Sequence, residues 1–333
     1  MADAYFSNIA SVDTDINNPN NWFTDVAFTN PYGSVPDFTN SSLTLQIGDN
    51  VTTIDCASNS TIVMECVFII SGNSTFANNN TFTNNNIFIN DGTFITNNTF
   101  TVNSTFTNYT TFTNNGAFTN NAGGTFTNNG TFTNNNTFTN NSTFANNSGT
   151  FTNSAGTFTN NNAFTNSSTF TNSGAFTNYL TFTNYTTFDN NNTFTNYSTF
   201  DNNLTFTNYI TFTNNGTFTN NNGFANIGTF INSGGTFTNN NTFTNTTGTF
   251  TNGGAFTNNN TVTISGGLFN NSSGTCTNNA TFVVQNASLG ISTASAFVNN
   301  SVFTYGNNYT TRFRGNIFPQ IPSSAAFGTA ILF

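Results

Sequence analysis

Positive charge is almost absent from this sequence. Among 333 residues there is no Lys and no His, the only cations are Arg312 and Arg314, and the net charge is −9. A protein needs Lys or Arg to neutralise the phosphates of nucleic acid or to be attracted to an anionic membrane surface. We therefore expect no nucleic-acid partner and no electrostatic attraction to anionic lipid.

The residues that usually carry catalysis are equally scarce. Without His or Lys the chain has no ordinary general base and no Cys–His pair. The only acids within the repeat described below are Asp91, Asp189 and Asp201. For Asp189 and Asp201 the simplest interpretation is that they are surface acids that replace threonine. We expect a protein that is not an enzyme, with no catalytic residue, no cofactor and no metal.

Long apolar runs are missing too. No segment reaches the roughly 18 consecutive apolar residues typical of a membrane span, and the start, MADAYFSNIASVDTD, lacks the basic and apolar regions of a classical signal peptide. Three cysteines cannot all pair within one chain; a Cys56–Cys66 bridge is conceivable, but buried free thiols at Cys56, Cys66 and Cys276 are favoured.

What the sequence does contain is one short repeat. Between Phe76 and Phe282 there are 34 units, most of them six residues long, and 32 are centred on Phe, with Val262 and Cys276 as the exceptions. Thr precedes the central residue in 27 units, and Asn follows it two places later in 30. Such a regular repeat indicates a stacked architecture.

The repeat predicts an all-β fold, a single-stack β-solenoid. A six-residue period would spread Phe around a helix, whereas Thr-Phe-Thr suits a strand and Asn-Asn-Gly suits a corner. Strand alternation places Phe on one face and its two Thr neighbours on the other, and burial favours Phe inside by about 2 kcal/mol per ring. The extra residues of longer units precede the Thr and include glycine, as expected for bulges at corners.

The number of sides per coil is inferred from a longer spacing in the sequence. Tyr185, Tyr197 and Tyr209 are spaced by twelve residues, and so are Asp189 and Asp201. This spacing favours two sides and twelve residues per coil, with the two aspartates one rung apart. A triangular coil of eighteen residues is the alternative.

The two fixed positions of the repeat have separate expected roles. Phenylalanines fill the coil as a core stack, represented by Phe126, Phe132, Phe138, Phe182, Phe188, Phe194, Phe200 and Phe206. Asparagines at the corners form hydrogen-bonded ladders along the stack, represented by Asn128, Asn134, Asn140, Asn184, Asn190 and Asn196.

The flanks differ from the repeat. Residues 1–70 hold eight of the eleven acids and the only tryptophan, Trp22, and we expect an N-terminal cap or assembly region there. Residues 71–285 form the predicted solenoid, and residues 286–333, with Arg312 and Arg314, form a C-terminal cap or docking segment. Trp22 and the two arginines are the candidate assembly residues, the arginines meeting the acidic N-terminal region of the next subunit.

Across residues 62–285 the chain resembles repetitive Asn/Thr-rich β-solenoid surface and fibre proteins of microbes and viruses. The resemblance implies a rigid, non-enzymatic structural protein that forms or decorates an extracellular, cell-surface or virion-surface fibre by end-to-end or lateral association with itself. An adhesin stalk, with surface carbohydrate as a partner, is a further alternative. A disordered, phase-separating chain is another, but the fixed register disfavours it.

The outward threonines suggest one more alternative. Thr-x-Thr on successive rungs makes a flat lattice, which resembles the array of insect antifreeze proteins. That resemblance implies ice binding. Here, however, Thr occurs on every side of the coil, and residues such as Ala117 and Gly223 interrupt it.

Overall fold

The computed structural model describes residues 4–7, 15–25, 27–48, 54–55, 61–285, 287–291, 296–305 and 312–313. The chain divides into two compact units, Met1–Thr169 and Phe170–Phe333, and both are built from the same kind of coil. Apart from one 3₁₀ turn, η1 (Pro19–Asn21), every regular element in the described part of the chain is a β-strand. The predicted all-β solenoid is confirmed.

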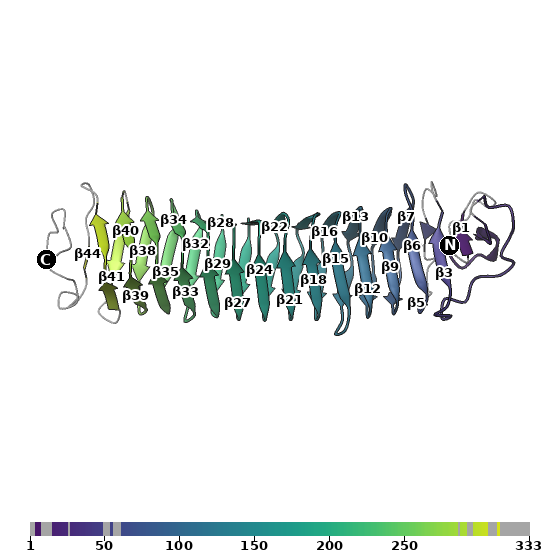
Figure 1. Ribbon diagram of the computed structural model, residues 1–333, viewed down its shortest axis with the longest axis horizontal. Coiled ribbons are helices and arrows are strands. Elements are labelled where there is room, and N and C mark those ends of the chain that lie inside the picture. Colours follow the sequence, from purple (N-terminus) through teal and green to yellow (C-terminus); the bar gives the residue numbers. More distant parts are fainter. Residues whose placement is uncertain are drawn as a thin grey trace. The chain divides into compact units, whose positions relative to one another are not determined.

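Most strands are four residues long because the repeat supplies one strand and one corner per unit. In Thr-Phe-Thr-Asn the second and fourth side chains are buried and the first and third face outward, as strand alternation requires. Consecutive strands belong to three different parallel sheets, here called faces A, B and C, and the next corner carries the chain to the next face. In Figure 1 the strands of each unit lie side by side as successive rungs.

The strands of the first unit are grouped by face. Face A consists of β2 (Trp22–Phe23), β1 (Ala4–Phe6), β3 (Thr44–Ile47), β6 (Val67–Ile70), β9 (Ile87–Asn90), β12 (Thr105–Asn108), β15 (Thr125–Asn128), β18 (Thr143–Asn146) and β21 (Ala163–Asn166). Face B consists of β4 (Ile54–Asp55), β7 (Thr75–Asn78), β10 (Thr93–Thr96), β13 (Thr111–Asn114), β16 (Thr131–Asn134) and β19 (Thr150–Asn153). Face C consists of β5 (Ile62–Met64), β8 (Phe82–Asn84), β11 (Thr99–Val102), β14 (Ala117–Asn120), β17 (Thr137–Asn140) and β20 (Thr157–Asn160).

The second unit repeats this arrangement. Its face A consists of β24 (Thr181–Asn184), β27 (Thr199–Asn202), β30 (Thr217–Asn220), β33 (Thr236–Asn239), β36 (Ala255–Asn258), β39 (Thr275–Asn278) and β42 (Ala296–Asn299). Its face B consists of β22 (Phe170–Asn172), β25 (Thr187–Asn190), β28 (Thr205–Asn208), β31 (Gly223–Asn226), β34 (Thr242–Asn245), β37 (Thr261–Ile264), β40 (Thr281–Val284) and β43 (Val302–Tyr305). Its face C consists of β23 (Ala175–Asn178), β26 (Thr193–Asn196), β29 (Thr211–Asn214), β32 (Thr229–Asn232), β35 (Thr249–Asn252), β38 (Leu268–Asn271), β41 (Ser288–Ile291) and β44 (Arg312–Phe313).

The coil has three sides, so the favoured two-sided, twelve-residue coil is wrong and the eighteen-residue alternative holds. From β3 onward each strand pairs with the third strand along the chain, in register, as Phe94 does with Phe112 in the first unit and Phe188 with Phe206 in the second. In a triangular coil each short corner changes the chain direction by only about a third of a full turn. In a two-sided coil each corner would have to reverse the chain direction.

Three phenylalanines per coil also pack better than two. The rings of Phe200 and Phe206, on neighbouring faces, meet edge to face, with centroids 5.1 Å apart and planes at 83°. Each ring then stacks on its copy one coil away, as Phe188 does on Phe206 at 4.9 Å and 8°. Both arrangements are favoured for aromatic pairs, so every ring is held by neighbours around the coil and along it.

Glycines allow the corners to pack closely or to bulge. Gly123, in the longest insertion, has φ of +91°, which a residue with a side chain rarely adopts. Gly149 has no such φ, but a Cβ there would overlap the carbonyl oxygen of Gly130 in the coil before it. The predicted position of the insertions, at corners outside the Thr-Phe-Thr strands, agrees with these contacts.

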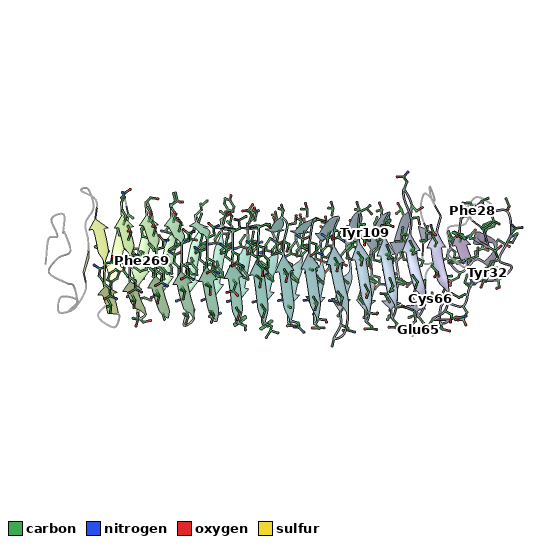
Figure 2. The ribbon with its side chains drawn as sticks, viewed as in Figure 1. Phe28, Tyr32, Glu65, Cys66, Tyr109 and Phe269 are labelled. Atoms are coloured by element: carbon green, nitrogen blue, oxygen red, sulfur yellow. The ribbon has the colours of Figure 1, made fainter. Side chains whose placement is uncertain are left out.

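Towards its C-terminal end the second unit departs from the repeat in a compensated way. On face B, Val262 replaces the central phenylalanine while Ile264 and Val284 replace the corner asparagines, and all three are buried. These positions therefore contribute aliphatic side chains to the core in place of a ring and two amides. The ring of Phe269, which is labelled in Figure 2, lies at 28° to that of Phe250.

The predicted boundaries at residues 70 and 285 do not coincide with a break in strand pairing. In the first unit β3 already pairs in parallel with β6, and in the second unit β40 pairs with β43. The first unit begins with β1, which pairs in parallel with β3 and antiparallel with β2.

Candidate functional site

The phenylalanines chosen from the sequence lie inside the coils of both units. The first unit buries Phe126, Phe132 and Phe138 completely, and the second buries Phe182, Phe188, Phe194, Phe200 and Phe206 completely. Each belongs to the network of edge-to-face and stacked contacts described above. These rings lie away from solvent, so their contribution is stability and stiffness.

The corner asparagines form an inner ladder along each face. In the first unit Asn128, Asn134 and Asn140 donate from Nδ2 to Oδ1 of Asn146, Asn153 and Asn160, over 2.7–2.8 Å. In the second unit Asn184, Asn190 and Asn196 donate in the same way to Asn202, Asn208 and Asn214, each over 2.8 Å. All these amides are fully buried, so each ladder supplies the hydrogen bonds that water would otherwise make.

Each amide also closes two corners. Nδ2 of Asn184 donates to the carbonyl oxygen of Thr186, two residues on, at 2.9 Å, and to that of Thr205 in the following coil at 3.0 Å. One side chain therefore joins its own corner to the next coil. An amide is needed for this role because it both accepts and donates.

The hydrogen bonds of the inner ladders all point in one direction along the stack. This direction explains why a few of the buried asparagine oxygens accept no hydrogen bond. Nδ2 always donates towards the C-terminal neighbour, so the first asparagine after an aliphatic residue receives no bond at Oδ1. Among the described residues the buried side-chain oxygens without a partner belong to Asn84, Asn90 and Asn120. They follow Met64, Ile70 and Val102, respectively, on the adjacent strand.

A second, outer ladder was not anticipated from the sequence. Exposed asparagines one position after the inner ladder also bond along the coil axis, as Asn115 does to Asn97 in the first unit and Asn240 to Asn221 in the second, both at 2.9 Å. The position is variable in sequence because it faces solvent, where glycine, serine or tyrosine also fits. The sequence signal that could have predicted this outer ladder is the recurrence of asparagine at this position in every third unit.

The two aspartates of the second unit do not stack on each other. Asp189 lies on face B between Thr171 and Thr207, whereas Asp201 lies on face A. The predicted one-rung separation is wrong because it assumed a two-sided coil. Asp91, in the first unit, lies at an exposed corner, where desolvation by neighbouring atoms raises the pKa of its carboxyl.

The tyrosines occupy corners, but their twelve-residue spacing places them at different corners. Tyr185 follows β24 of face A, Tyr197 follows β26 of face C and Tyr209 follows β28 of face B. Tyr197 instead stacks on Tyr179, one full coil earlier, with centroids 5.1 Å apart. In the first unit Tyr109 is an exposed corner residue (Figure 2).

Trp22, a candidate assembly residue, is buried in the first unit. Its Nε1 donates to the carbonyl oxygen of Ile16 at 2.8 Å, and its ring meets the edge of Phe6 at 5.3 Å. Its side chain therefore belongs to the core of the N-terminal region. Arg312 lies in β44, and Arg314 lies outside the described residues.

The acids near Trp22 are held in loops by local hydrogen bonds. Asp25 accepts bonds from the backbone N–H groups of Thr29 and Asn30, and these bonds lower the pKa of its carboxyl. The hydroxyl and N–H of Thr39 lower the pKa of the Asp37 carboxyl in the same way. Both groups are therefore ionised at neutral pH, and this region carries negative charge.

Two cysteines are buried free thiols. Burial raises the pKa of Cys66 to about 11 and that of Cys276 well above its ordinary value. Cys66 lies beside Met64, with 3.6 Å between the sulfur atoms, close to Glu65 in Figure 2. Cys56, the other half of the conceivable bridge, lies outside the described residues.

The surface formed by these coils offers rows of hydroxyl and amide groups. Within the described residues no group of three or more His, Cys, Asp or Glu side chains is arranged to hold a metal ion. In the same part of the chain no helix is long and apolar enough to cross a membrane.

Comparison of the chain with known protein families, with curated proteins and with solved structures finds no match.

Proposed function

We propose that this chain is a non-enzymatic structural protein, a stiff β-solenoid that forms or decorates an extracellular or virion-surface fibre. The observation that carries the proposal is the use made of the repeat. Phe and Asn, its two fixed positions, are both buried. The Phe rings stack on those of the neighbouring coils, and the Asn amides form hydrogen bonds to the neighbouring coils. The two fixed positions of the repeat thus contribute to a stiff core. Its solvent-facing positions carry small neutral groups suited to a hydrated spacer.

Assembly through the flanks is part of the proposal. A solenoid has strand edges at its ends, which must be capped or joined to another subunit. The first unit carries a cap in which Asp25 and Asp37 are ionised. The two arginines near the C-terminus, Arg312 and Arg314, have the complementary charge, so the C-terminal flank of one copy would meet the N-terminal cap of the next.

Sedimentation velocity over a range of concentrations tests this assembly. We expect the wild-type sedimentation coefficient to rise with concentration and to fall at high salt, which screens exposed charges. The variant Arg312→Gln/Arg314→Gln should remain small. A matched control, Thr131→Glu/Thr217→Glu, makes the same change in net charge at two exposed positions within the repeat, away from both flanks, and should assemble as wild type; equal loss in both variants would contradict the pairing.

Ice binding is a second candidate because of one regular surface in the first unit. On face C, strands β11, β14, β17 and β20 pair in register, and their outward positions are all Thr except Ala117. Such rows give a flat lattice with about 4.8 Å between rungs. Thermal hysteresis and ice-crystal shaping, lost on Thr139→Lys, would support this function, and neither effect in the wild type would reject it.

A further inference from the structure

The exposed apolar side chains of the second unit are concentrated in a few coils. In the described part of that unit, every large hydrophobic residue that is well exposed lies between Tyr179 and Ile227. Elsewhere in the described part of this unit the corners carry Asn, Ser, Thr, Gly, Ala or Gln. The only carboxylates of the repeat in this unit, Asp189 and Asp201, lie in the same coils.

Face B combines these features on one surface. Strands β25, β28 and β31 present outward Thr187 and Asp189, then Thr205 and Thr207, then Gly223 and Ala225. The last pair is the smallest on the face, and a Cβ at Gly223 would meet only the carbonyl oxygen of Leu204, at 3.6 Å. The row of threonines therefore has a hollow at β31.

Apolar side chains border this surface at both corners. Tyr185 and Leu204 precede β25 and β28, with exposed fractions of 54% and 42%, respectively. Tyr209, Ile210 and Ile227 follow β28 and β31 on the other side, and Ile210 is 52% exposed. The strip of hydroxyl groups and one carboxylate thus runs between two apolar edges.

From this surface, here called the face B strip, we infer a binding site for a neutral polysaccharide. A sugar ring has an apolar face of C–H groups, which packs on tyrosine, leucine or isoleucine, and a rim of hydroxyls, which bonds to threonine and to a carboxylate acceptor. Two rungs span about 9.6 Å along the solenoid, close to the length of a disaccharide. A disaccharide unit aligned with the axis would therefore span strands β25, β28 and β31.

Charge argues for this ligand over others. Asp189 and Asp201 are the only charged side chains on these coils, so anionic polymers are repelled. A second copy packed at the same level would bring carboxylates of like charge together. The inference goes beyond assembly, because a single unassembled chain carries the whole strip.

The chain itself supplies substitutions that keep the fold. Tyr185→Asn/Asp189→Thr/Tyr209→Asn restores the residues that occupy these positions in most other units. Gly223→Thr/Ala225→Thr fills the hollow with the common residues of the repeat. The matched control is Tyr109→Asn/Ala117→Thr in the first unit, which makes the same kinds of change away from the strip. Far-UV circular dichroism checks that all variants fold.

Native gels cast with soluble hydroxyethyl cellulose, xylan, galactomannan or dextran provide the test. We expect at least one polymer to retard the full-length wild type and the control equally, and to bind each strip variant about tenfold more weakly, which corresponds to about 1.4 kcal/mol. One variant loses two exposed rings that pack on the sugar, and the other places two larger side chains where the sugar would lie. No retardation by any polymer, or equal retardation of the strip variants, would overturn the inference. A change in sedimentation without a change in retardation would instead identify the strip as a contact between copies.

Discussion

Replacing one rung of an inner ladder by its charged isostere tests the role of the amides most sharply. Asn202 is fully buried and accepts a bond from Nδ2 of Asn184 at 2.8 Å. Its own Nδ2 faces three acceptors: Oδ1 of Asn220 at 2.8 Å and the carbonyl oxygens of Gly223 at 2.9 Å and Leu204 at 3.3 Å. In Asn202→Asp an oxygen replaces this nitrogen and faces those same acceptors.

The cost of this substitution should depend on pH. A buried carboxyl with one oxygen facing only acceptors has a pKa raised by about 3–5 units, at 1.36 kcal/mol per unit. The loss at pH 8 is limited by the roughly 4 units between pH 8 and the unfolded pKa of about 3.9, so we predict a loss of about 4–5.5 kcal/mol at pH 8. Because the folded-state pKa lies above the unfolded value of about 3.9, the loss disappears below about pH 4. There the protonated acid donates to one of the acceptors and restores the ladder.

Urea denaturation followed by circular dichroism, together with hydrogen exchange of residues 199–223, measures the effect at pH 4 and pH 8. The control Asn202→Val reproduces the arrangement that Val102 already has in the first unit, where it leaves Oδ1 of Asn120 without a partner. Its cost should be about 1–3 kcal/mol at both pH values. An Asn202→Asp loss that is absent at pH 8, or equal at the two pH values, would refute the ladder reasoning.

Three further outcomes follow from the same structure. Val102→Asn should raise the urea midpoint of the chain, because the new amide bonds to Oδ1 of Asn120; an unchanged or lower midpoint would contradict this. Gly149→Ala should lower the thermal midpoint of unfolding, because the added Cβ overlaps the carbonyl oxygen of Gly130 in the preceding coil. Gly234→Ala should leave the midpoint unchanged, because a Cβ there meets nothing within 4 Å. In a Cys56→Ser/Cys276→Ser variant, the Cys66 thiol, buried and with its pKa raised to about 11, should react with Ellman's reagent at pH 8 only after urea is added; rapid reaction of the folded variant would show that Cys66 is exposed.

The core was predictable because its physical requirement repeats in every unit. A residue such as Phe200 must be buried in each coil, and Asn202 must bond to the coils on either side, so their positions hardly vary. Period and strand alternation were enough to assign both roles. The ladders and the buried rings therefore follow from the sequence without knowledge of the coil's shape.

The number of sides was mispredicted because the evidence used came from exposed corners. Tyr185 and Tyr197 face solvent, so nothing requires their spacing to match the coil. The close contacts between corners of successive coils depend on the coil length instead. A Cβ at Gly235 would overlap the carbonyl oxygen of Gly216, and a Cβ at Gly254 would overlap the carbonyl oxygen of Gly235. Glycine therefore recurs at every third unit, a signal of three sides that the sequence contained.

The surface was the hardest part to interpret. Outward positions tolerate Thr, Ala, Asp or Gly, so the sequence alone does not show that Asp189, Gly223 and the exposed tyrosine and isoleucine side chains share one face. Only the register of the three-sided coil brings them together. The face B strip is thus a product of the coil geometry, and a motif search along the chain does not find it.

Negative-stain electron microscopy of the purified chain at increasing concentration tests the central claim, that this is a self-assembling structural solenoid. The account predicts filaments that lengthen with concentration and that are lost in the Arg312→Gln/Arg314→Gln variant. Single particles of one size at every concentration would contradict assembly through the flanks.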